Sequence, residues 1–94
     1  MIGNQKEVKD MTVFIGIHKM DGPVEEDLIE KSWVAYKEAC EKRGIKGIRV
    51  GYNAEKGIAH CITEANSEDE VHEAHEDTNK DMMPQEIFEI KTLE

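Results

Sequence analysis

The feature that most restricts the fold is the order of two kinds of segment along the chain, those with the apolar spacing of strands and those with the apolar spacing of helices. Three early segments alternate or run apolar in the manner of strands: residues 11–19, 45–53 and 57–65. Apolar residues at helical spacings of three and four separate the first two segments and also follow the third. With a last short strand in QEIFEIKTL after Pro84, the predicted order is strand, helix, strand, strand, helix, strand.

The boundaries of the two predicted helices are marked by residues that start or stop helices. Pro23 fits the first position of a helix, and Gly44 is a good C-terminal stop. Ser67 and Glu70 have the spacing of a capping box, which opens a second helix through about residue 80. Its predicted inner stripe is Val71, Ala74, Thr78 and His75. NAEKG joins the two middle strands as a hairpin.

This element order predicts a ferredoxin-like βαββαβ sandwich of the α+β class, with a four-stranded antiparallel sheet and two helices on one face. Residues 1–10 are predicted to be a flexible N-terminal lead-in, and residues 11–94 a single domain. Two helices cover only one sheet face, and Phe14 cannot share the face of Ile15. We expect the Phe14 face to be exposed or covered by a second copy, as a homodimer packed through the sheets.

Charge and composition bear on partners and location. The 94-residue chain has 21 acidic and 12 basic residues, a formal charge of −9, so nucleic acid and anionic membranes are not expected partners. No run approaches the roughly 20 apolar residues of a membrane span, and residues 1–10 lack the apolar core of a signal peptide. A cytoplasmic location is therefore expected, with Cys40 and Cys61 as reduced thiols.

The histidines are the candidate metal ligands. His72 and His75 are three residues apart on the second helix, where His75 should border the interior and His72 should face solvent. Two interpretations are open: both are ordinary histidines at the surface or edge of the helix, or at least one of them is a metal ligand. Neutral imidazole suits nickel, copper, zinc or iron. His18 and His60 lie on strands that this fold makes neighbours, so they form either a cross-strand pair or two separate residues.

The sulfur-containing and aromatic residues leave further alternatives open. Cys61 alternates with His60 and must point to the other sheet face, as packing or as a ligand. Cys40 on the inner stripe of the long helix is predicted to be structural. Two sets of residues have both a packing and a binding interpretation: Trp33 with Tyr36 as core or stacking platform, and Met82 with Met83 as docking residues or copper(I) ligands. Phosphate-loop, dinucleotide, nucleophile-elbow and CxxC motifs are absent, which argues against an enzyme.

The run HCITEANSEDEVHEAH, residues 60–75, resembles a pattern in a family of small ferredoxin-like proteins, formally a domain of unknown function. The matching positions are Cys61, Glu64, Ala65, Glu73, Ala74 and His75. One described actinobacterial member of that family is a nickel-binding dimer. The resemblance therefore implies a ferredoxin-like homodimer that binds a transition metal. His60 stands where the family often has an aromatic residue, and His72 where it often has a basic one.

The sequence therefore favours a small cytoplasmic protein that binds a divalent transition metal for sequestration or delivery, without catalytic turnover. Nickel ranks before zinc and copper. The candidate ligands are His75, His18, His60, His72 and Cys61. The first alternative is a dimeric α+β barrel enzyme or small-ligand module with its cavity near Trp33, Tyr36 and Tyr52. The second is a protein interaction domain without a ligand.

Overall fold

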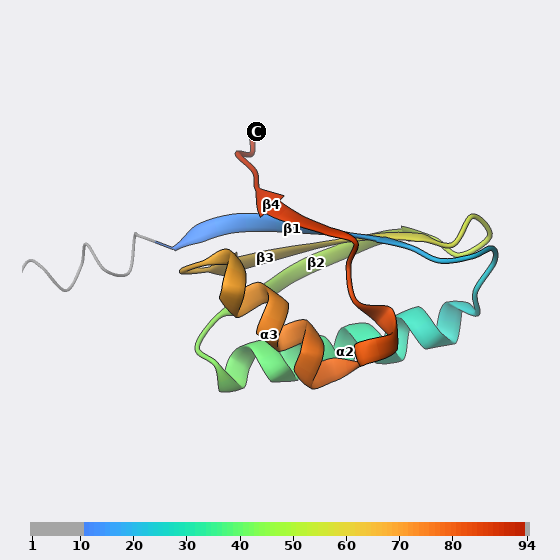
Figure 1. Ribbon diagram of the computed structural model, residues 1–94, viewed down its shortest axis with the longest axis horizontal. Helices are drawn as coiled ribbons and strands as arrows, with labels where there is room; N and C mark the ends of the chain where they lie inside the picture. The colour runs from blue at the N-terminus through green and yellow to red at the C-terminus, as the bar shows by residue number, and fades with distance from the viewer. Residues whose placement is uncertain (1–10, 94) are drawn as a thin grey trace, which may run out of the picture.

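A computed structural model describes residues 11–93, and it confirms the predicted fold (Figure 1). Its elements are β1 (Thr12–Lys19), α2 (Glu26–Lys42), β2 (Lys46–Asn53), β3 (Ile58–Ala65), α3 (Glu68–Thr78), the 3-10 helix η1 (Lys80–Met82) and β4 (Glu86–Glu89). The sheet has the strand order β2-β3-β1-β4 with antiparallel neighbours, and α2 and α3 lie on the same face of it. This is the ferredoxin-like α+β arrangement. The predicted lead-in, residues 1–10, lies outside the described residues.

The helix ends follow the predicted signals with one shift. α2 begins at Glu26 instead of Pro23, because the backbone N–H of Val24 donates to Ala54 in the hairpin turn at 2.9 Å and holds the segment away from helical geometry. Gly44 takes the left-handed conformation, φ 75°, that ends α2. Ser67 caps α3 by accepting from the N–H of Glu70 at 3.3 Å. Within residues 11–93, no helix is long and apolar enough to cross a membrane.

The core lies between the helices and the inner face of the sheet. Its buried residues come from both layers: Phe14, Tyr36, Cys40, Ile45, Ala65, Val71 and Ala74. A buried hydrogen bond of 2.6 Å between the Tyr36 hydroxyl and the Thr63 Oγ1 joins α2 to β3. Cys40 is completely buried in this core, in agreement with its predicted structural position.

The prediction of which face of β1 is uncovered was wrong. Phe14 is 6 % exposed beneath the helices, whereas Ile15 and Ile17 are half-buried on the outer face. Both faces of β1 are apolar, so alternation alone does not decide which face packs against the helices. The neighbouring strand decides it, because β3 turns small side chains such as Ala59 inward and leaves room for helix side chains. The outer face instead aligns Ile15 with its cross-strand partners Ile62 and Phe88.

Candidate metal centre

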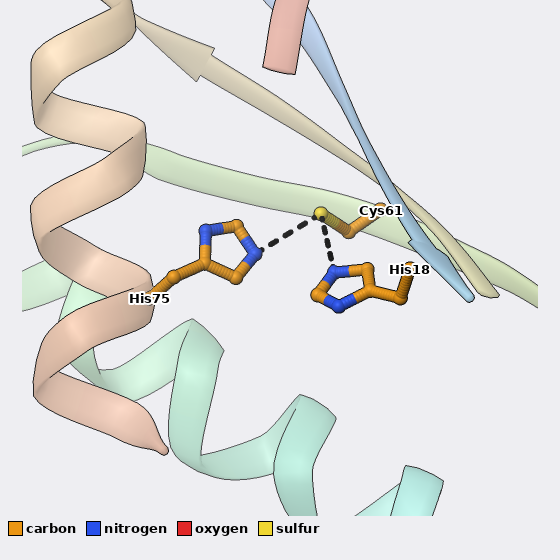
Figure 2. A group of neighbouring side chains, drawn as sticks. All are labelled: His18, Cys61 and His75. Atoms are coloured by element: carbon orange, nitrogen blue, oxygen red, sulfur yellow. Dashed lines mark hydrogen bonds between the residues drawn. The ribbon is translucent and has the colours of Figure 1, made fainter. Parts of the chain in front are cut away.

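Three side chains from three separate elements meet between the sheet and α3 (Figure 2). They are His18 from the end of β1, Cys61 from the middle of β3, and His75 from α3, and they are 8 %, 3 % and 6 % exposed. The Cys61 Sγ lies 3.3 Å from the His75 Nε2 and 3.7 Å from the His18 Nε2. All three donor atoms lie within 4.8 Å of one another. Ligands about 2.0 to 2.3 Å from one ion have similar mutual spacings, so the cluster has the dimensions of a metal site.

Strand register explains why the thiol can reach both rings. Cys61 is paired directly with Gly16 on β1, and His18 is two residues further along the same inner face. A Cβ atom at Gly16 would lie 2.8 Å from the Cys61 Sγ and 3.6 Å from the His75 Cε1. The space that a side chain at this position would fill is therefore occupied by the thiol and the imidazole.

A backbone carbonyl orients one of the two imidazoles. The His75 Nδ1 lies 2.8 Å from the carbonyl oxygen of Val71, one turn earlier in α3, and we assign the proton to this nitrogen. The Nε2 lone pair then faces the thiol. The His18 Nε2 also faces the Cys61 Sγ, at 3.7 Å. Hydrogen bonds of this kind fix the tautomer and the ring orientation of metal-ligating histidines.

Burial sets the charge state of the cluster. Burial lowers the pKa of His75 to about 4, and it also lowers the pKa of His18. Burial raises the pKa of the Cys61 thiol to about 12. At neutral pH the cluster therefore consists of two neutral imidazoles and one protonated thiol. A metal ion would bind the imidazoles without competition from protons and would displace one proton, from Cys61.

A cavity of about 50 Å³ adjoins the three donors. Trp33 and Tyr36 line it, and the Tyr36 ring packs on His75 with the ring centroids 4.2 Å apart. Pockets for organic ligands have volumes of about 300 to 1,000 Å³, so this cavity suits an ion and its immediate surroundings instead. Tyr52, which was expected near an organic ligand, donates a hydrogen bond from its hydroxyl to Glu26 at the surface.

The other two candidate ligands lie away from the cluster. His60 is exposed on the outer face of the sheet, paired with Ile17 and not with His18, so of the two alternatives the structure has the two separate residues. His72 is exposed on α3, with its Nδ1 3.8 Å from a carboxylate oxygen of Glu76. Gly16 was missed as part of the site. A glycine inside an apolar strand is a signal of close approach by another group and could have identified it.

The fold and the cluster together define a ferredoxin-like α+β protein with a buried His-Cys-His group that could hold a metal ion. A solved structure with a similar fold is described as the crystal structure analysis of SCO4226 from Streptomyces coelicolor A3(2). It matches with a TM-score of 0.77 and 17 % sequence identity, over 87 % of this chain and 99 % of that one. At this identity the likeness concerns the fold alone. No family model and no curated protein matches the sequence, and nickel binding stays a prediction.

Proposed function

We propose that this protein binds one transition-metal ion through His18, Cys61 and His75 and acts in its storage or delivery. The spacing of the three buried donor atoms, all within 4.8 Å, is the observation that carries the proposal. The backbone hydrogen bond that orients the His75 ring supports it, because the site is arranged before an ion arrives. The cavity of about 50 Å³ leaves little room for a substrate beside an ion, which favours binding over catalysis.

The donor set restricts the kind of ion. One thiolate and two imidazoles are borderline to soft ligands, which suit zinc, copper and nickel and not calcium or magnesium. The preference for nickel comes from the family resemblance at Cys61 and His75, and the donor set itself does not rank nickel above the other two. His60 and His72 take no part in the proposed site.

Titration of the metal-free protein tests the proposal. Zinc(II), nickel(II) and anaerobic copper(I) are each added, and we expect at least one to saturate near a 1:1 ratio with a dissociation constant of about 1 μM or lower. Binding should release about one proton per ion at neutral pH, from the thiol. Nickel should also show thiolate-to-metal absorption in the near ultraviolet.

Two variants serve as the comparison. Cys61→Ser should weaken binding and remove the charge-transfer band, whereas His72→Gln, which changes an exposed histidine of the same helix, should leave both unchanged. The proposal is wrong if none of the three ions binds at micromolar concentration, or if Cys61→Ser binds as well as the unchanged protein does.

The assembly proposed for this protein is a homodimer that covers the outer sheet face. Ile15, its two cross-strand neighbours Ile62 and Phe88, and Ile17 give that face an apolar centre. Sedimentation should therefore show a dimer at micromolar concentration, and Ile15→Glu should shift it toward the monomer. Val34→Glu is the matched control, because Val34 is 53 % exposed on α2. A monomeric unchanged protein, or equal effects of the two substitutions, would contradict this assembly.

A further inference from the structure

A fourth soft donor lines the cavity of the three candidate ligands. Met82 ends η1, is half-buried and borders the same cavity as His18, Cys61 and His75. Its Sδ accepts a hydrogen bond from the Ser32 Oγ on α2 at 3.4 Å, and Ser32 borders the same cavity. η1 is thereby tied to α2, and Met82 is held beside the cavity.

The charge of the cluster favours an ion with a single positive charge. The residues that the structure describes in this cluster include one thiol and no carboxylate. When Cys61 binds as a thiolate, it supplies one negative charge, which a monovalent cation neutralises completely. A divalent cation would leave one uncompensated positive charge among buried groups, which costs free energy.

The lining of the cavity favours an ion with few ligands. Much of it is apolar, from side chains such as Ile29, Trp33, Val50 and Ala59. The aliphatic side chains among these offer no hydrogen-bond partners to the waters that would complete an octahedral shell around three protein ligands. Soft thiolate and thioether ligands select copper(I), and imidazole is also a suitable ligand for copper.

From these observations we infer that the site selects copper(I), with the Met82 Sδ as a weaker fourth ligand beside His18, Cys61 and His75. This inference rests on the proposed metal-binding function and specifies its ion. Copper arrives already reduced, so no electron is transferred on binding. The Cys61 Sγ forms a bond to copper, and the proton of the thiol passes to solvent.

Met82→Leu tests the inference, because leucine keeps an apolar side chain of similar volume and removes the sulfur. Met83→Leu is the matched control, since Met83 is the next residue and does not line the cavity. Affinity for copper(I) is measured anaerobically by competition with a chromogenic copper(I) chelator, and affinity for zinc(II) by competition with a zinc indicator. We expect Met82→Leu to weaken copper(I) binding about tenfold and zinc binding by less than about twofold. Met83→Leu should change neither.

X-ray absorption at the copper edge gives an independent measurement. The copper-loaded protein should show two sulfur ligands, and Met82→Leu should show one. The inference is overturned if Met82→Leu retains the copper(I) affinity and the sulfur count, or if zinc binding weakens equally. Cys61→Ser separates this failure from failure of the proposed function. If Cys61→Ser loses copper(I) binding and Met82→Leu keeps it, the proposed role of Met82 is wrong and the proposed metal-binding function stands. If Cys61→Ser retains binding, both the inference and the proposed function are wrong.

Discussion

Gly16→Ala is expected to lower metal affinity about a hundredfold, because it displaces the thiol from both imidazoles. The added Cβ would lie 2.8 Å from the Cys61 Sγ, closer than real Cβ atoms approach other heavy atoms. The thiol is the end of a short side chain and gives way more easily than the backbone does. Gly16 does not have a positive φ, so alanine is not strained by the backbone conformation. The damage should therefore fall on the site and not on the strand.

Gly51→Ala provides the matched control for this substitution. Gly51 lies on β2 of the same sheet, and an added Cβ there meets nothing within 4 Å. The two variants are compared by metal titration and by thermal unfolding. Cys61→Ser is measured beside them and gives the metal affinity that remains when the thiol ligand is removed. We expect Gly51→Ala to bind metal normally and Gly16→Ala to approach Cys61→Ser while retaining a cooperative unfolding transition. Normal binding by Gly16→Ala would show that the thiol position is not required for the site.

Most of the fold was predictable because its signals are local. The strand alternation of residues 11–19, the capping box at Ser67 and the stop at Gly44 each depend on neighbours within a few residues, and each is present in the structure. The orientation of β1 was not predictable in the same way. Phe14 and Ile15 are both apolar, and only the packing of α2 and α3 against β3 decides which of them is covered.

The candidate site was predictable only in part because it depends on register. The phase of α3 was sufficient to turn His75 inward and His72 outward. The partner of His18 depends on which residue of β3 lies opposite Gly16, and a shift of one residue would have brought His60 to the inner face instead of Cys61. The position of Met82 beside the cavity depends on the short η1 turn that follows α3, which periodicity does not identify.

Acid is expected to destabilise the metal-free protein through His75. In the folded protein burial lowers the pKa of this imidazole to about 4, whereas an unfolded histidine titrates near 6.5. The unfolded chain therefore binds more protons than the folded protein between these values. The contribution of this group to the free energy of unfolding is fully present above about pH 6.5. It is lost as the pH falls toward about 4, and the loss is about 3 kcal/mol. Burial lowers the pKa of His18 as well, so His18 adds to the loss in the same direction.

The loss should be large beside the roughly 5 to 15 kcal/mol that stabilises a domain of this kind. The groups that face the His75 ring are Tyr36, His18 and Cys61, and none of these three is a carboxylate that would stabilise an imidazolium. Urea unfolding at about pH 7.5 and about pH 4.5, with a chelator present, measures the free energy of unfolding under both conditions. His75→Gln should lose less stability between the two pH values than the unchanged protein does.

The exposed histidine of α3 supplies the control for this experiment. His72→Gln should lose more stability between the two pH values than His75→Gln does, because the His72 side chain is 53 % exposed whereas His75 is buried. Acid-induced changes elsewhere, including those at the exposed ion pairs between Arg43 and α3, are common to all three proteins and cancel in the comparison. If His75→Gln and His72→Gln depend on pH equally, the buried imidazole is not the group that links folding to protons.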